Sequence, residues 1–218
     1  MLDWTEIEDT QAKATLGQFP AGTRFRQCVP SFFRRGRLIR AENEEWGDTH
    51  SYAVEFEARF AGLTGEEQEA LAACGLAGMN VTEENLADYL VFHRYFTRAV
   101  GHSFVLGPEY DFLTPVLGIA DRDASDAMGS VEITGVDPRS GFRCSYSALL
   151  RSDLVCRFDA LVTRDGQVEV KSSKRICMCQ IPLRVELDPW DYLIAQRRRC
   201  KKVPVSWWRR LQWKAIRR

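Results

Sequence analysis

The stretch from residue 129 to residue 186 most constrains the fold, because apolar and polar residues alternate there between turn signals. Alternation with a period of two places one set of side chains on each face of a β-strand. Turn signals such as Asp137-Pro138 and Asp165-Gly166 separate the alternating segments. Several short strands joined by turns predict an antiparallel meander. The predicted strands cover residues 130–136, 142–149, 154–162, 167–172 and 176–187.

Two helices are predicted between residues 64 and 101. Thr64 followed by Glu67 fits a capping box at the start of the first helix, and Gly75 and Gly78 are expected to interrupt that helix. The second helix is predicted to begin at Thr82, where two acidic residues suit the first turn, and to end at Gly101. Its apolar face contains Leu86, Tyr89, Leu90, His93 and Phe96.

The order of these segments indicates the fold class. Residues 51–60 alternate with a period of two and predict one more strand, although Glu and Ala there also favour a helix. Asp188-Pro189 is expected to open a third helix. Together the segments predict an α+β fold, with helices packed on a mainly antiparallel or mixed β-sheet. We expect one domain over residues 1–195 and a basic, helical C-terminal tail over residues 196–218.

The formal net charge of zero hides a strong asymmetry along the chain. All 30 acidic residues lie at or before Asp191, whereas residues 196–218 contain ten Lys or Arg and no acidic residue. The tail therefore carries a charge of +10, and the rest of the chain carries −10. Such a basic arm is typical of proteins that bind nucleic acid or an anionic membrane.

Tryptophans interleave with the cations of this tail. Arg and Lys contact phosphates, and Trp stacks on unpaired bases, so the pattern predicts nucleic-acid binding. A peripheral contact with an anionic membrane surface and docking on a protein partner remain alternatives. A second basic patch is expected over residues 24–40, where six Arg accompany three Phe. The predicted nucleic-acid-binding residues of the tail are Arg197, Arg198, Arg199, Lys201, Lys202, Trp207, Trp208, Arg209, Arg210, Trp213 and Lys214.

The chain is expected to be cytoplasmic or nuclear. Its first residues are acidic and lack a long apolar run, which argues against a signal peptide. Nowhere does an apolar stretch approach the roughly 20 residues that a transmembrane helix needs. The seven cysteines are an odd set and are expected to be reduced in that location. A zinc site of Cys156, Cys177 and Cys179 is an alternative, although C-x-C is not the usual C-x-x-C spacing.

Three charged residues of one predicted hairpin indicate chemistry. Asp159 in its first strand, and Glu169 and Lys171 in its second, project away from the apolar face of their own strand. A three-residue loop over residues 164–166, with its glycine in the left-handed conformation, pairs Leu161 with Glu169 and Asp159 with Lys171. A two-residue turn would put Asp159 on the apolar face of the second strand. Patterning therefore favours the three-residue loop.

Such a cluster suits metal-assisted hydrolysis. Two nearby carboxylates bind a hard divalent cation such as Mg²⁺ or Mn²⁺. The cation polarises a phosphodiester and lowers the pKa of a bound water, while Lys171 orients that water or stabilises the developing charge. The alternative is an ordinary solvated sheet face, in which Asp159 and Lys171 form a cross-strand ion pair.

Asp159 followed by Glu169-x-Lys171 resembles the D…(D/E)-x-K core of the PD-(D/E)xK nuclease superfamily. The resemblance implies a metal-dependent nuclease acting on DNA or RNA, with Asp159 and Glu169 as metal ligands and Lys171 as the catalytic lysine. It also implies a helix after the lysine strand, where this sequence predicts a strand. A preceding helix often supplies another acid in that family, and the candidates here are Glu83, Glu84 and Asp88.

Two other classes of function compete with the nuclease. One is a non-enzymatic nucleic-acid-binding or adaptor protein that acts through its basic tail. The other is a peripheral membrane or matrix-type protein anchored by its tryptophan-rich end. The sequence contains no Ser-His-Asp spacing, no phosphate-cradling glycine loop and no dinucleotide fingerprint.

Overall fold

The computed structural model describes residues 4–7, 22–43, 50–63, 67–96, 103–106, 114–115, 131–137, 141–150 and 154–180. Within these ranges the chain forms two antiparallel β-sheets and two helices, which confirms an α+β fold with mainly antiparallel sheet. None of the described helices is long and apolar enough to cross a membrane. The third predicted helix and the basic tail lie outside the described residues.

The first sheet has five strands in the order β1-β2-β3-β4-β5. Each strand pairs antiparallel with its neighbour in the sequence, so the sheet is a simple meander. Its strands are β1 (Thr5–Glu6), β2 (Arg24–Cys28), β3 (Arg37–Glu42), β4 (His50–Phe56) and β5 (Arg59–Leu63).

The second sheet has the order β6-β9-β10-β11-β7, and β8 also pairs with β9. The strands predicted over residues 130–136, 142–149 and 154–162 are confirmed as β8, β9 and β10. The strand predicted over 167–172 and the described part of the strand predicted over 176–187 are instead one continuous strand, β11, and residues 181–187 lie outside the described residues. The bounds are β6 (Ser103–Val105), β7 (Thr114–Pro115), β8 (Glu132–Asp137), β9 (Gly141–Leu150), β10 (Leu154–Val162) and β11 (Val168–Gln180).

Two β-bulges explain why β11 looks like two strands in the sequence. The register between β10 and β11 shifts between Asp159 and Ala160 and again between Val155 and Cys156. The extra residues on β11 are Lys171 and Ile176. A bulge inserts one residue and reverses the alternation of faces beyond it. The period of two is therefore lost in the sequence although the backbone stays extended.

The single strand predicted over residues 51–60 is a hairpin of β4 and β5. Its two-residue turn consists of Glu57 and Ala58, whose φ angles are +50° and +59°. Positive φ at both positions is the turn geometry that matches the twist of the flanking strands. The sequence conceals this turn, because neither residue is the Gly, Asn or Asp that usually occupies it.

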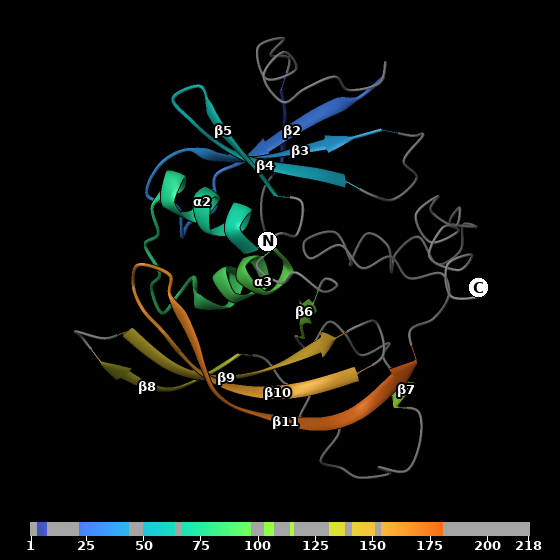
Figure 1. Cartoon of the computed structure of the whole chain (residues 1–218), viewed down its shortest axis with the longest axis vertical. Coiled ribbons are helices and arrows are strands. Elements are labelled where there is room, and N and C mark those ends of the chain that lie inside the picture. Colours follow the sequence, from blue (N-terminus) through green and yellow to red (C-terminus); the bar gives the residue numbers. More distant parts are fainter. Residues whose placement is uncertain are drawn as a thin grey trace.

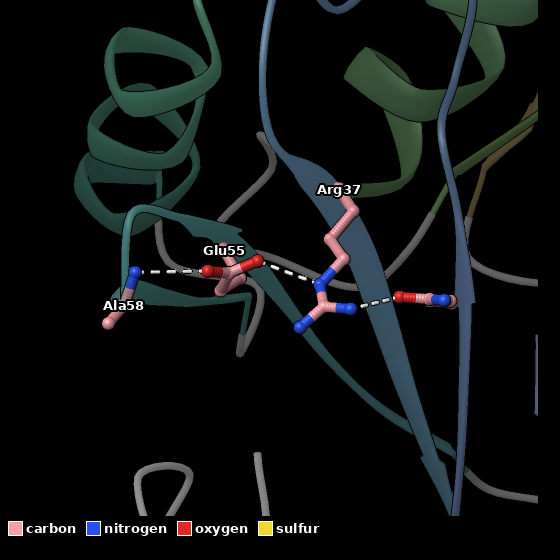
Figure 2. A network of polar contacts seen from close by, with 4 residues as sticks. Arg37, Glu55 and Ala58 are labelled. Atoms are coloured by element: carbon pink, nitrogen blue, oxygen red, sulfur yellow. Dashed lines mark hydrogen bonds and ion pairs between the residues drawn. The ribbon is translucent and has the colours of Figure 1, made fainter. Parts of the chain in front are cut away.

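Side chains of the neighbouring strands hold this turn in place. Figure 2 shows the Glu55 carboxylate between two donors. Its Oε1 accepts the backbone N–H of Ala58 at 3.0 Å, and its Oε2 accepts Nε of Arg37 at 2.7 Å. The ion pair with Arg37 fixes the carboxylate where it can cap the turn.

The helices are α2 (Glu67–Ala77) and α3 (Leu86–Phe96). The expected interruption at Gly75 is wrong, because α2 continues to Ala77; a helical glycine costs about 1 kcal/mol but does not forbid the helix. α2 ends before Gly78, whose φ is +64°. α3 begins at Leu86 rather than at Thr82, because the Asn85 side chain accepts the Thr82 N–H at 2.8 Å and holds a turn there.

The two helices lie between the two sheets (Figure 1). α2 contacts β4 and β5, and α3 contacts β6. Buried side chains from both sheets and both helices form one hydrophobic cluster. α3 consequently buries Phe92 and Arg94 in addition to most of its predicted apolar face, whereas His93 is only half-buried. Sheets on both sides leave this helix little solvent-exposed surface.

Candidate functional site

The β10–β11 hairpin carries the three predicted catalytic residues, and its tip has the predicted loop. The N–H of Thr163 donates to the Gln167 carbonyl at 2.9 Å, and Leu161 lies opposite Glu169. Gly166 has a φ of +87°, as a three-residue loop requires. A Cβ on Gly166 would also lie 2.6 Å from Cγ of Met79, so the tip needs glycine for space as well as for conformation.

The hairpin tip docks on the helix layer. The N–H of Val81 donates to the Arg164 carbonyl at 2.9 Å. The hydroxyl of Tyr89, which is fully buried in α3, donates to the Gly166 carbonyl. Burial raises the pKa of Tyr89 far above its ordinary value, so the hydroxyl stays protonated and remains a donor. These bonds set the position of the strand ends that lead to the candidate site.

The predicted pairing of Asp159 with Lys171 is wrong. The bulge at Lys171 moves the partner of Asp159 on by one residue, to Ser172. The Ser172 hydroxyl donates to Oδ2 of Asp159 at 2.5 Å. Nζ of Lys171 instead forms an ion pair with Oε1 of Glu169. Hydrophobic periodicity cannot reveal this single-residue insertion, because the residues on both sides of it are polar or exposed.

Asp159 and Glu169 nevertheless share one face of the hairpin. Glu169 lies opposite Leu161, two residues from Asp159 along β10, so the two acids are diagonal neighbours. Such neighbours have Cα atoms about 7–8 Å apart, within reach of one another's side chains. Both side chains are exposed, and each already contacts a polar partner. In the part of the chain that the structure describes, no group of three or more His, Cys, Asp or Glu could hold a metal ion.

The preceding helix does not complete this carboxylate pair. α3 packs on the opposite face of the sheet, where the guanidinium carbon of Arg94 lies 4.3 Å from the centroid of the Phe158 ring. Asp159 follows Phe158 in β10 and projects to the other face. The structure therefore does not bring to Asp159 the acids expected from this helix, namely Glu83, Glu84 and Asp88.

Beyond these residues β11 presents a run of exposed polar side chains that sequence reasoning missed. A strand with one buried face should alternate in exposure, yet seven consecutive residues of β11, from Glu169 to Arg175, are exposed. Lys174 and Arg175 in this run form no ion pair with any residue that the structure describes. The signal in the sequence is the absence of apolar residues at five consecutive positions. The run, called here the β11 basic run, consists of Lys171, Ser172, Ser173, Lys174 and Arg175.

The run lies on a sheet edge. Between Val168 and Met178, β11 pairs with β10, and no other described strand pairs with it there. Lys174 lies opposite Arg157 and Arg175 lies opposite Cys156, so the two cations project to opposite faces of the sheet. A ligand that follows this edge can therefore contact cations on both sides.

The second basic patch expected over residues 24–40 is not assembled as a surface for base stacking. Three of its arginines are engaged in ion pairs. Nη2 of buried Arg40 lies 2.6 Å from Glu42, Nε of Arg26 lies 3.5 Å from the same carboxylate, and Nε of Arg37 lies 2.7 Å from Glu55. The three phenylalanines of this stretch are core residues, namely Phe25, Phe32 and Phe33. The predicted tail contacts between Arg197 and Lys214 lie outside the described residues.

The alternative zinc site is not assembled either. Cys156 belongs to the core that faces the helices, whereas Cys177 lies opposite Val155 and therefore projects to the other face. Cys177 and Cys179 share that other face, and their sulfurs are 3.5 Å apart. Burial, with the hydrogen bond between Cys177 and Cys179 as a smaller cause, raises the pKa of Cys179 to about 12.

Comparisons of the chain with protein-family models, with curated proteins and with solved structures found no match. The likeness to the PD-(D/E)xK nucleases therefore rests on Asp159, Glu169 and Lys171 alone.

Proposed function

We propose that this protein binds nucleic acid through the β11 basic run together with its basic C-terminal residues. The observation that carries the proposal is the exposure of Lys174 and Arg175, which have no ion-pair partner among the described residues. Cations in water bind phosphates mainly by releasing condensed counterions. The exposed Ser173 hydroxyl between the cations adds a neutral donor for phosphate oxygens, whereas that of Ser172 already donates to Asp159.

The charge of residues 196–218 supports the same proposal. Their +10 follows β11 in the chain, so the two basic regions belong to one C-terminal part of the protein. The phosphate contacts of β11 are independent of base sequence, and the tryptophans of the tail favour unpaired bases. We therefore expect a preference for single strands with little sequence specificity.

Charge reversal on β11 tests this proposal. Lys174→Glu with Arg175→Glu is compared with Arg24→Glu plus Arg59→Glu, which changes the net charge equally on the five-stranded sheet. Binding is measured by fluorescence anisotropy with a labelled single-stranded oligonucleotide, in the full chain and over a range of salt. The β11 variant should weaken binding about tenfold or more at ~0.1 M salt, and its salt slope should fall by about 1.5, as expected for two lost phosphate contacts.

The control variant separates a local surface from overall charge. It should weaken binding no more than about twofold, because nonspecific charge effects are screened over about 10 Å at this salt. Equal weakening by both variants would contradict a β11 contact. Binding of the wild type to anionic vesicles but not to oligonucleotides would replace nucleic acid with a membrane surface.

A second candidate function, metal-dependent phosphodiester hydrolysis, is favoured by one observation. Asp159 and Glu169 are on the same face of the hairpin, and Lys171 lies beside Glu169. Mg²⁺ or Mn²⁺ between the carboxylates would polarise a phosphate that the β11 basic run holds. The cation would have to compete with Ser172 for Asp159 and with Lys171 for Glu169.

Calorimetry with Mn²⁺ tests the second candidate. The wild type should bind the cation, and Asp159→Ala and Glu169→Ala should each abolish that binding. Ser172→Ala is the informative third variant: it frees the Asp159 carboxylate, so Mn²⁺ affinity should be unchanged or increased. Absence of heat with the wild type would leave these residues as a solvated sheet face and the protein as a non-enzymatic binder.

A further inference from the structure

Two cysteines near the end of β11 form a close, buried pair. Cys177 and Cys179 are each about 3% exposed, and both project to the same face because they are two residues apart in a strand. Their sulfurs are 3.5 Å apart. Met178 between them is exposed and projects the other way. The two thiols are therefore each other's polar neighbours, and both are shielded from bulk water.

The backbone keeps this pair from forming a disulfide without distortion. Residues two apart in a strand are separated by about 6.6 Å, and their Cβ atoms are about equally far apart. A disulfide needs Cβ atoms about 3.5–4.5 Å apart. The two sulfurs lean together across that gap, but the Cβ atoms cannot follow while β11 stays paired with β10. The pair is thus a dithiol that is too wide for a disulfide.

The same gap fits one metal ion. Two metal–sulfur bonds of about 2.3 Å each span up to about 4.6 Å. Side-chain rotation that opens the sulfurs by about 1 Å from 3.5 Å is enough for a nearly linear arrangement. The described residues contain no group of three or more His, Cys, Asp or Glu that could hold a metal ion, so they do not form a four-ligand zinc site. Soft thiolates suit Cu(I), zinc and iron–sulfur clusters. Structural zinc and these clusters take four protein ligands, which leaves Cu(I) for a pair.

We propose that Cys177 and Cys179 bind one Cu(I) ion as a two-coordinate thiolate pair. Each thiol gives up its proton to solvent, and the two thiolates with Cu(I) carry a net charge of −1. No electron is transferred, so neither oxidant nor reductant is consumed. This inference is independent of nucleic-acid binding, because the side chains of Cys177 and Cys179 are buried whereas the β11 basic run is exposed.

Competition with a colorimetric Cu(I) chelator under anaerobic conditions tests the site in the full chain. Cys200→Ser serves as the parent, so that a thiol outside the described residues makes no contribution to Cu(I) binding. Cys177→Ala and Cys179→Ala are made in that parent. The matched control is Cys156→Ala, a buried cysteine of the adjacent strand that projects to the opposite face.

The parent should bind one equivalent of Cu(I). Each of the two site variants should weaken binding by more than about a hundredfold, which exceeds the loss expected when only a residue that contacts a ligand is changed. Cys156→Ala should bind as the parent does. Because two protons are released on binding, the apparent binding constant should rise as the pH rises.

Two readouts keep the test decisive if a variant unfolds. Circular dichroism reports folding of each variant, and X-ray absorption of the loaded parent counts the sulfur ligands directly. Two sulfur scatterers on copper support the pair. Retained binding in either site variant, equal loss in the control, or no Cu(I) uptake by the parent would overturn the proposal.

Discussion

Replacing Ala58 with glycine should stabilise the protein. Ala58 occupies the second position of the β4–β5 turn with a φ of +59°, in the left-handed region. Its methyl group is exposed and therefore contributes little packing. Its N–H bond to Glu55 is made by the backbone, so glycine retains it (Figure 2). The substitution changes the conformational cost of the turn and little else.

The magnitude follows from two opposing terms. A left-handed conformation costs an L-residue about 1–2 kcal/mol, and glycine removes that cost. Glycine adds about 0.5–1 kcal/mol of conformational entropy to the unfolded chain. The net gain in the free energy of unfolding is about 0.5–1 kcal/mol, which corresponds to about 1–4 °C in Tm for a chain of this size.

Urea unfolding and thermal melts measure the effect, and Ala72→Gly provides the matched control. Ala72 is exposed in the middle of α2, so the same chemical change should there lower the free energy of unfolding by about 1 kcal/mol. Opposite signs for the two variants support the assigned turn. Destabilisation by Ala58→Gly as large as that by Ala72→Gly would refute the left-handed conformation at residue 58.

Two further predictions concern buried groups. Tyr89→Phe removes the donor to the Gly166 carbonyl and should lower the free energy of unfolding by about 1–2 kcal/mol in urea melts; no change would mean that the bond contributes nothing. Stability should also fall above about pH 9, because buried thiols with raised pKa values keep protons that the unfolded chain releases there. Each thiol contributes a slope approaching 1.4 kcal/mol per pH unit, so Cys74→Ala should flatten the decline measured between pH 8 and 10.5 by about that amount. The thiols are those of Cys144, with a pKa of about 11, and Cys28, Cys74 and Cys179, each about 12.

The sequence predicts β10 residue for residue but divides β11 in two. In β10 the apolar face is continuous from Cys156 to Val162, so alternation and turn signals agree on its bounds. In β11 two bulges reverse the alternation, and a polar run at an edge mimics a loop. The alternation of apolar and polar residues therefore predicts a strand well where one face is buried. It predicts a strand poorly where both faces are exposed, as over residues 169–175 of β11.

The candidate site divides in the same way. The loop and the pairing of Leu161 with Glu169 follow from local rules about turns and faces, and both are confirmed. Asp159 lies opposite Ser172 instead of the predicted Lys171 because of a β-bulge, and no local sequence rule predicts that bulge. Because of this one inserted residue, Asp159 forms a hydrogen bond with Ser172 instead of the predicted ion pair with Lys171. Lys171 forms its ion pair with Glu169 instead.

The sequence pattern does not predict that α3 is covered by a sheet on each side, for a different reason. Periodicity assigns α3 one apolar face, whereas two sheets cover it and bury Arg94 as well. The guanidinium carbon of Arg94 lies 4.3 Å from the Phe158 ring centroid and 5.8 Å from that of Tyr146. Aromatic faces stabilise a buried cation by their quadrupole. These rings come from strands that are distant from α3 in the sequence. The sequence around Arg94 therefore predicts an exposed side chain.

The edge of β11 that no described strand covers has to avoid pairing with another chain. Bulges and lysines at an edge both discourage strand addition, and β11 has a bulge at Lys171 and another at Ile176. One lysine and one bulge would suffice for that protection. Three cations and two serines in five exposed positions exceed it, and Lys174 and Arg175 repel another basic edge of the same kind. Such an edge would repel a second copy of itself, and under the proposal it would attract a polyanion. Charge reversal at these two positions is therefore the decisive substitution.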